Sequence, residues 1–268
     1  MKASQSRWAA LLAAGRAGSG TASMIVARVP KMRALLAPRY GVPTLDTFLH
    51  RRAIMTALCR QLGNFRGTVL DIGCGEMPYK ALLMAPPSRA TRYIGLDLGG
   101  DRYGAFPDLI WDGSTIPLAS SSVECALATE VLEHCPSPVQ VVAEACRVLV
   151  PGGLLFFTVP FLWPLHEVPH DEYRYTPFSL RRILAEGGFD RVELAALGGW
   201  DAALAQILGL WVRRRLCSSW KHRLLRSVLS PLALPVIWLL AKVDRPPGEF
   251  CESSMITGLA GAAFKPGT

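Results

Sequence analysis

Paired cysteines are absent from this chain of 268 residues. Its cysteines are odd in number and form no Cys-x-x-Cys pair; they are Cys59, Cys74, Cys125, Cys135, Cys146, Cys217 and Cys251. A disulfide framework or a zinc ribbon requires closely spaced pairs, so the pattern argues against both. Scattered thiols of this kind are typical of small buried side chains in a reducing compartment. The sequence therefore predicts a cytoplasmic protein.

Acidic residues are absent from the first 45 positions, which carry seven lysines and arginines. A second basic segment, residues 202–245, carries eight such residues against one acid, Asp244, so the rest of the chain is net acidic. An acid-free start rich in Ala, Arg and Ser suits an organelle transit peptide or the loose leader of an Ala/Arg-rich bacterial protein, and we favour the leader. A secretory signal is not evident, because Arg16 follows too soon after the apolar residues 8–14.

Internal repeats and low-complexity tracts are also lacking. From Thr68 onward short apolar runs alternate with helical patterns, which indicates a parallel sheet covered on both faces. We therefore expect an α/β fold with a doubly wound, mostly parallel, seven-stranded sheet. The expected strands are residues 68–72, 92–97, 108–111, 123–130, 154–160, 191–197 and 254–264.

Two helices are expected between these strands. Residues 139–149 have an amphipathic pattern, and a second helix begins at Thr176 as N-cap with Pro177 in its first turn. Gly187 and Gly188 would stop that helix, and residues 151–153, Pro-Gly-Gly, predict a turn before the fifth strand.

This pattern divides the chain into four parts. We expect a basic helical leader over 1–65, a core over 66–200, a basic amphipathic helical insertion over 201–245 and the final strand of the core within 246–268.

The insertion has apolar residues at helical spacing. Leu204, Ile207, Leu208 and Trp211 share one helix face, and the uncharged run 227–241 follows, with two prolines in only 15 residues. A membrane-spanning helix needs about 20 apolar residues, so a transmembrane segment is disfavoured. Two interpretations stay open, which are an element lying on an anionic membrane surface and a helical cap over the core.

A zinc-hydrolase motif, His-Glu-x-x-His, occurs within LHEVPHDEYRYTP, residues 165–177. Its two histidines bind one metal only when both lie on one face of a helix. Pro169 disfavours a helix there, and no third ligand follows at a familiar spacing. The sequence therefore predicts a loop and no metal site.

A third glycine is missing after the first strand. Gly73 and Gly75 allow a tight turn, but position 78, where a dinucleotide fingerprint has glycine, is Pro78. Asp71 ends the strand, and its charge would repel a pyrophosphate but suit a cationic amino acid group. The turn thus disfavours NAD.

Four motifs in order, VLDIGCGEMPY, YIGLD, ATEVLEH and VLVPGGLLFFTVP, are found between residues 69 and 160. Together they resemble the class I S-adenosylmethionine-dependent methyltransferases, in particular small-molecule and lipid methyltransferases built on the bare seven-stranded, Rossmann-like domain. The resemblance implies S-adenosyl-L-methionine as the cofactor. It implies contacts to the amino acid end of the cofactor from Asp71, Gly73, Cys74 and Gly75, to the ribose from Asp97 beside Leu98, to the adenine from Asp112 and Gly113, and near the sulfonium from Thr129 and Glu130.

The loop after the fifth strand, residues 161–176, lies where the methyl acceptor is expected. A hydroxyl acceptor must lose its proton, and a histidine oriented by a carboxylate can accept it near neutral pH. The catalytic candidates are His166, His170 and Asp171, and the acceptor-binding candidates are Tyr173, Arg174, Tyr175 and His134. Alternatively, Asp171 and Arg174 pair to hold the loop down while the tyrosines pack under it.

The sequence thus predicts methyl transfer from S-adenosylmethionine, with oxygen as the favoured target, to a small-molecule or a lipid- or glycan-linked acceptor. The basic segments suggest an anionic membrane surface or a phosphate-bearing substrate. Three alternatives remain. Nucleic acid as substrate is disfavoured, because no RNA-binding module or Asn-Pro-Pro-Tyr box is present. A non-catalytic assembly factor and a zinc hydrolase are the others, and the oligomeric state is not indicated.

Overall fold

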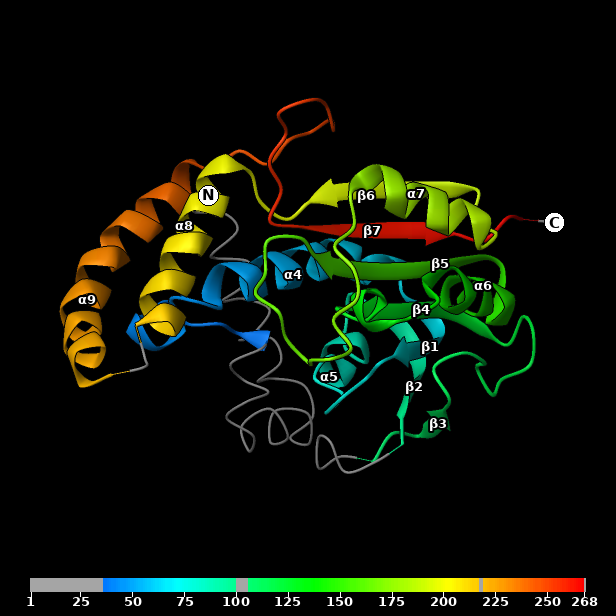
Figure 1. Ribbon diagram of the computed structural model, residues 1–268. Coiled ribbons are helices and arrows are strands. Elements are labelled where there is room, and N and C mark those ends of the chain that lie inside the picture. The colour runs from blue at the N-terminus through cyan, green and yellow to red at the C-terminus, as the bar shows by residue number, and fades with distance from the viewer. Residues whose placement is uncertain (1–35, 100–105, 217–218, 268) are drawn as a thin grey trace.

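A seven-stranded sheet forms the centre of the protein (Figure 1). The computed structural model describes residues 36–99, 106–216 and 219–267. The strand order is β3-β2-β1-β4-β5-β7-β6, with β7 antiparallel to both of its neighbours and every other pair parallel. The strands are β1 (Arg66–Ile72), β2 (Arg89–Leu98), β3 (Leu109–Trp111), β4 (Val123–Thr129), β5 (Leu149–Pro160), β6 (Arg191–Ala196) and β7 (Gly258–Phe264).

Helices cover the sheet and extend beyond it. The α-helices of the described residues are α4 (Phe48–Gln61), α5 (Lys80–Leu83), α6 (Pro138–Val148), α7 (Pro177–Glu186), α8 (Trp200–Leu210) and α9 (Trp220–Val243). Short 3-10 turns are η1 (Val42–Thr44), η2 (Leu62–Asn64) and η3 (Leu132–His134), and η4 (Trp211–Arg215) is a π-helical turn at the end of α8.

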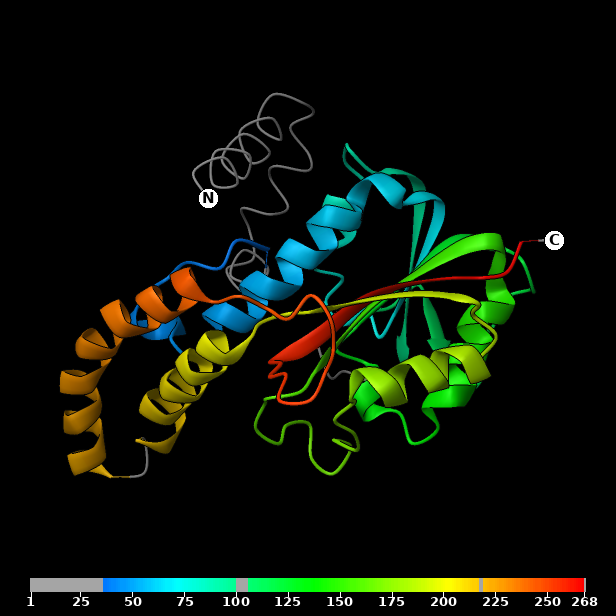
Figure 2. The ribbon, with the colours of Figure 1, turned by 90° about the horizontal axis from the view of Figure 1, so that it is seen from above.

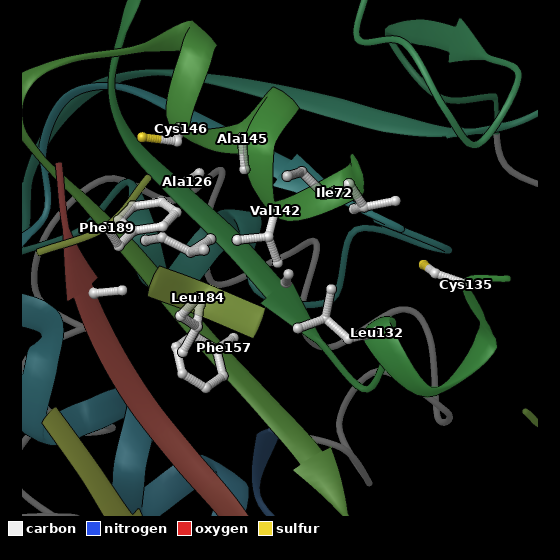
Figure 3. Close-up of a cluster of buried hydrophobic side chains, with 14 of the residues drawn as sticks. Ile72, Ala126, Leu132, Cys135, Val142, Ala145, Cys146, Phe157, Leu184 and Phe189 are labelled. Atoms are coloured by element: carbon white, nitrogen blue, oxygen red, sulfur yellow. The ribbon is translucent and has the colours of Figure 1, made fainter. Parts of the chain in front are cut away.

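One face of the sheet packs against α6 and α7. Figure 3 shows Val142 and Ala145 of α6 beside Ala126 of β4, with Leu184 of α7 near Phe157 of β5. All five side chains are almost completely buried. Burial of apolar area at about 25 cal/mol per Å² is the main contribution to the stability of such a layer.

The opposite face packs against α4 and α5. Leu58 of α4 and Leu83 of α5 lie in one cluster with Phe65, Val69 and Phe156. Helix α4 belongs by sequence to the expected leader, yet it contributes to the core of the domain. The expectations for residues 1–35 lie outside the described residues.

Helices α8 and α9 form a hairpin that projects from one end of the sheet (Figure 2). Its own small core contains Ala205, Val212 and Ile237, together with Leu45 from the segment before α4. Gly209 permits this contact, because a Cβ there would lie 2.2 Å from the carbonyl oxygen of Leu45.

The two ends of the hairpin are joined by the carboxylate of Asp244. It accepts hydrogen bonds from the backbone N–H groups of Gly199, at 3.0 Å, and Ala202, at 2.9 Å. The acid that follows α9 thereby caps the start of α8, where the helix dipole favours negative charge.

The outer side of α9 is apolar and exposed. Its exposed large side chains recur at intervals of three to four residues; they include Leu224, Val228, Leu232, Val236, Leu239 and Val243. Within the described part of the chain, α9 is the one helix long and apolar enough to cross a membrane, by length and composition alone.

The strand and helix expectations from the sequence are confirmed, including Thr176 as N-cap of α7, whose side chain accepts a hydrogen bond from the N–H of Ser179. One detail was wrong. The expected turn at residues 151–153 is an irregularity inside β5, where Gly152 has a φ of 69°. Helix α9 runs through both Pro231 and Pro235 and is longer than the uncharged run 227–241 noted in the sequence.

Candidate active site

The strand order of the sheet reverses between β1 and β4. After β1 the chain adds β2 and β3 on one side, and then returns to place β4 on the other side of β1. Ligands of open α/β sheets bind in the crevice at this kind of switch point. The site residues predicted from the motifs lie at the carboxyl ends of these strands.

The turn after β1 is held by the neighbouring strand. The N–H groups of Gly73 and Cys74 both donate to the carbonyl of Leu96, at 2.8 and 3.1 Å. Gly73 has a φ of 68°, and a Cβ there would lie 2.5 Å from Val131. Gly75 has a φ of 49° and open space where its Cβ would be. The turn therefore needs its glycines and leaves room for a ligand above the second one.

Cys74 is buried within this turn. Burial, with the nearby carboxylates Asp71 and Asp97, raises the pKa of its thiol to about 12. The side chain thus stays a neutral thiol. The cofactor contact that the resemblance implies for Cys74 would therefore come from its backbone.

Asp97 connects β2 to the glycine turn. One carboxylate oxygen accepts from the N–H of Gly75 and the other from the N–H of Leu98, each at 2.7 Å. A carboxylate can accept about four hydrogen bonds, so capacity for two further donors remains. A ribose diol supplies two hydroxyl donors of this kind. The Leu98 side chain beside it is half-exposed.

Asp71 is buried beneath the turn. Its carboxylate accepts a hydrogen bond from the hydroxyl of Tyr93 on β2, a partner that the sequence did not indicate. Burial raises the pKa of Asp71 to about 7, partly offset by the Tyr93 hydrogen bond and reinforced by Asp97. The carboxyl therefore keeps its proton to a much higher pH than an exposed aspartate does.

The loop after β3 is ordered by Asp112. Its carboxylate accepts from the N–H groups of Ser114 and Thr115, both at 2.8 Å, and these hydrogen bonds lower its pKa to about 2. Gly113 has a φ of 82°, and a Cβ there would approach Leu98 to 3.5 Å. Asp112 thus shapes the wall next to Leu98, where the resemblance implies the adenine.

These features fit S-adenosylmethionine. The open glycine turn suits its amino acid end, and the spare acceptor capacity of Asp97 suits its ribose hydroxyls. Thr129 is the last residue of β4 and lies within hydrogen-bonding reach of Tyr79.

Glu130, directly after β4, binds a histidine from a distant helix. Its Oε2 accepts from Nε2 of His50 on α4 at 2.8 Å, and its Oε1 accepts from the hydroxyl of Thr158 at 2.8 Å. Burial alone would raise the pKa of Glu130, but the charge and hydrogen bond of His50 outweigh it, and the pKa is lowered. Glu130 is therefore ionised when His50 carries a proton on both ring nitrogens, and its carboxylate orients the imidazole through Nε2.

His50 was not predicted from the sequence. It lies 80 positions before Glu130, in a helix assigned to the leader, and no local motif surrounds it. Its ring stacks on Trp163 of the 161–176 loop, with centroids 4.4 Å apart. The guanidinium of Arg214, from the end of α8, also lies over the Trp163 ring, 5.0 Å from its centre. The loop, α4 and the hairpin thus meet at Trp163.

The loop residues expected to bind the acceptor mainly hold the loop in place. Arg174 donates twice to Asp171, at 2.6 and 2.7 Å, and keeps the pKa of that carboxyl well below its usual range. Tyr175 is buried and donates to the carbonyl of Leu132 at 2.7 Å, so it is not available to an acceptor. Tyr173 stacks on Tyr175 and remains partly exposed. The Asp171–Arg174 pair of the structural alternative is thus present, and Tyr175 packs under the loop as that alternative expects.

The two histidines of the zinc-hydrolase motif do not lie on a helix, and they point to different surroundings. The side chain of His170 is exposed, and its carbonyl accepts from Nδ1 of His134 at 2.9 Å. His166 lies against His134, with ring centroids 4.7 Å apart, and its Nδ1 is 3.2 Å from Asp171. Burial lowers the pKa of His166, although Asp171 opposes the shift. The structure thus brings His134 and His166 together and leaves the imidazole of His170 outside.

Glu133 is the second residue that sequence reasoning missed. Its side chain is 0% exposed, and neither carboxylate oxygen has a hydrogen-bond partner among the described residues. Burial, followed by the nearby Glu130, raises its pKa well above the usual value. A signal was present, because Glu133 directly precedes His134 in the quoted motif ATEVLEH.

Comparisons with known proteins identify a methyltransferase domain in this chain. A family model described as a methyltransferase domain matches residues 70–157. A Mycolicibacterium smegmatis protein named probable S-adenosylmethionine-dependent methyltransferase is 35% identical over 140 residues, which are 50% of this chain and 51% of that protein. An uncharacterized methyltransferase of Mycobacteroides abscessus is 36% identical over 137 residues, covering 45% of this chain and 50% of the relative. An uncharacterized 37.1 kDa protein in transposon TN4556 of Streptomyces fradiae is 35% identical over 103 residues, covering 35% and 30%.

The chain thus spans about half or less of the length of these curated relatives. Among solved structures, a chain of the complex that contains the Haloferax volcanii Trm112 methyltransferase activator matches with a TM-score of 0.50 and 16% identity. The match covers 83% of this chain and 97% of that one, and it bears on the fold alone.

Proposed function

Because the chain carries a class I S-adenosylmethionine-dependent methyltransferase domain, we propose that it transfers the methyl group of S-adenosylmethionine to a hydroxyl of a small-molecule or a lipid- or glycan-linked acceptor. The observation that carries the choice of oxygen is the hydrogen bond between His50 and Glu130 at the end of β4. An amine can attack from its neutral form, whereas a hydroxyl needs a group that removes its proton.

The cofactor supplies a methyl group on a positively charged sulfur, which is an electrophile that needs no further activation. The chain's own task is to position it. The glycine turn at residues 73–75 receives one end, and Asp97 accepts hydrogen bonds from the ribose hydroxyls. The ionised Glu130, next to Thr129, places negative charge near the sulfonium.

His50 is the proposed proton acceptor. Glu130 holds its Nε2, and Nδ1 has no hydrogen bond to the described residues. A carboxylate that binds one ring nitrogen fixes the tautomer and stabilises the imidazolium that forms when the other accepts a proton. The acceptor hydroxyl gives its proton to His50, its oxygen bonds to the methyl carbon, and the C–S electron pair stays on sulfur as S-adenosylhomocysteine leaves.

We place the acceptor over the 161–176 loop, at an anionic membrane surface. The hairpin formed by α8 and α9 supports this location, because α9 has a continuous exposed apolar stripe. Lys221 and Arg223 are exposed at its start and Lys242 near its end. Apolar side chains flanked by basic residues are typical of helices that lie in the headgroup region. Arg214 connects the hairpin to Trp163 and so to His50.

The cofactor part is tested by calorimetric titration with S-adenosylhomocysteine. We expect micromolar binding to the wild type and a loss of at least tenfold in Asp97→Asn. Asp190→Asn is the matched control, because Asp190 is exposed before β6, at the opposite edge of the sheet. No binding by a folded wild type would contradict the proposal.

The acceptor part needs a transfer assay. Radiolabelled S-adenosylmethionine is incubated with the protein and with separate lipid and water-soluble extracts of bacterial cells, and labelled products are identified by mass spectrometry. We expect a methyl ether or ester. An exclusively N-methylated product would refute the choice of oxygen.

A further inference from the structure

We propose that Glu133, His134 and His166 bind a divalent first-row transition-metal ion at the acceptor side of the site. One ligand atom from each of the three side chains lies within 4.8 Å of the others. Ligands about 2.0–2.2 Å from a metal ion lie roughly 3–4 Å from one another, so small side-chain rotations close the site.

Glu133 is the strongest indication of a cation. It is completely buried, and among the described residues no donor reaches either of its oxygens. A buried carboxylate without partners is costly, and a bound cation supplies the missing partner. The ring of His134 lies nearby, with its Nε2 3.8 Å from Oε1, which is beyond hydrogen-bonding distance.

The two histidines are oriented as metal ligands usually are. A ligating histidine uses one ring nitrogen for the metal and donates the other N–H to a carbonyl or carboxylate. Nδ1 of His134 donates to the carbonyl of His170, which leaves Nε2 on the side of Glu133. Nδ1 of His166 faces Asp171 at 3.2 Å, close enough for an ion pair but without hydrogen-bond alignment. Asp171, fixed by Arg174, thus has the place of an outer carboxylate.

The donor set selects the kind of ion. Two imidazoles and one carboxylate suit Zn²⁺ and neighbouring transition metals, whereas Mg²⁺ and Ca²⁺ prefer oxygen ligands. Three protein ligands leave coordination positions for other groups. This site differs from the zinc-hydrolase motif, because it uses His166 but not His170, and it departs from the sequence-based expectation of no metal.

The role of the ion rests on the proposed hydroxyl methylation. A divalent metal that binds the acceptor oxygen lowers the pKa of the hydroxyl and fixes its position. The proton then passes to His50, and the metal keeps its oxidation state throughout. The backbone carbonyl of Glu133 accepts hydrogen bonds from the N–H groups of Glu172 and Tyr173, at 2.9 and 3.1 Å, so Glu133 is tied to the loop whose Trp163 stacks on His50. An oxygen bound to the ion would therefore lie beside this loop, on the acceptor side of Glu130.

Metal binding is tested on tag-free protein that has been treated with a chelator and dialysed. Co²⁺ is titrated while its visible absorption is recorded, and Zn²⁺ is then added as a competitor. We expect one Co²⁺ per chain, displaced by Zn²⁺, and at least tenfold weaker binding in Glu133→Gln, His134→Gln and His166→Gln. His170→Gln is the matched control, because its exposed imidazole lies outside the cluster while its carbonyl is retained.

Two outcomes would overturn the proposal. One is wild-type protein that binds S-adenosylhomocysteine but no Co²⁺. The other is binding that His170→Gln removes and Glu133→Gln leaves within twofold. Thermal unfolding and S-adenosylhomocysteine titration of every variant identify misfolded proteins, and His134→Gln provides an independent ligand variant if Glu133→Gln does not fold. Failure of the methyltransferase proposal has a different signature, which is absence of S-adenosylhomocysteine binding in the wild type whatever its metal content.

Discussion

The imidazole of His50 and the carboxylate of Glu130 are 2.8 Å apart, although 80 positions separate them in the chain. If His50 accepts the proton of the acceptor, His50→Gln should lower turnover by about 10²–10⁴ and leave S-adenosylhomocysteine affinity within twofold. Steady-state kinetics and calorimetry on the same preparation measure both. Arg60→Gln, an exposed position of the same helix, is the control. Equal turnover in His50→Gln and wild type would remove His50 from the mechanism.

The pair of Asp71 and Tyr93 makes stability depend on pH. The pKa of Asp71 is about 7 in the folded protein, above its ordinary value near 3.8. The folded state therefore retains a proton that the unfolded state has lost, and this contribution to stability is complete below the unfolded pKa and disappears as pH rises toward 7. Asp71→Asn should gain stability relative to wild type across this window. Urea unfolding at pH 4.5, 5.5, 6.5 and 7.5 measures the difference, and a pH-independent difference would contradict the assignment.

Removing the hydroxyl that binds Asp71 tests the same pair from the other side. The Tyr93 hydrogen bond lowers the pKa of Asp71, so Tyr93→Phe should raise that pKa and extend the pH-dependent loss of stability to higher pH. The titration of the Asp71 carboxyl, followed by carbon-detected NMR, gives the shift directly. A lower pKa in Tyr93→Phe would be the wrong sign.

Gly209 is required for the attachment of the hairpin. A Cβ at this position would lie 2.2 Å from the carbonyl oxygen of Leu45, and a backbone atom cannot move aside as a flexible side chain can. Gly209→Ala should cost about 1–3 kcal/mol of unfolding free energy, whereas Gly63→Ala should have little effect, because a Cβ there meets nothing within 4 Å. Chemical denaturation compares the two. Similar stability of both variants would show that the segments separate without cost.

The hairpin should bring the protein to anionic vesicles. We expect co-sedimentation with vesicles that contain phosphatidylglycerol and little with neutral ones, reduced at high salt. Lys221→Glu with Arg223→Glu should weaken binding by removing the basic flank of α9. Val228→Asp and Leu232→Asp probe the exposed apolar stripe separately, and each should weaken binding at high salt as well as at low salt.

The basic residues of η4 are a poorer choice for that experiment, because Arg214 already contacts Asp46 and Trp163. Arg182→Glu with Arg191→Glu, on the exposed surface of α7 and β6, is the matched charge control. Binding that survives both the charge reversals and the apolar substitutions would exclude the hairpin as the membrane-binding element.

Local patterns predicted most of the sheet and the cofactor side of the site. The glycine turn, Asp97 and Glu130 each end or follow an apolar strand, and parallel strands bring such positions to one edge. His50 could not be found in this way, because its role depends on α4 packing against the sheet and not on neighbouring residues. Glu133 was passed over because a glutamate in a short helical turn is ordinarily exposed, and only the fold shows that it is buried.

The prolines of α9 show a different limit. Each removes one N–H and is expected to end or bend a helix in water. Pro231 and Pro235 lie four residues apart, in the middle of a helix whose inner side is covered by α8, and the remaining hydrogen bonds of α9 keep it continuous. Packing against a neighbouring helix therefore outweighs the local cost that each proline imposes on α9.

Asp244, the residue after α9, binds the backbone at the start of α8. The chain therefore leaves the sheet and returns to it at neighbouring points. Strands β6 and β7 can therefore keep their pairing whatever the length or composition of the segment between those two points. The hairpin is in this sense an interchangeable part. A different pair of helices closed by the same acid would direct the same catalytic domain to another surface, at the cost of replacing the contacts that Gln206 and Arg214 make with the loop over His50.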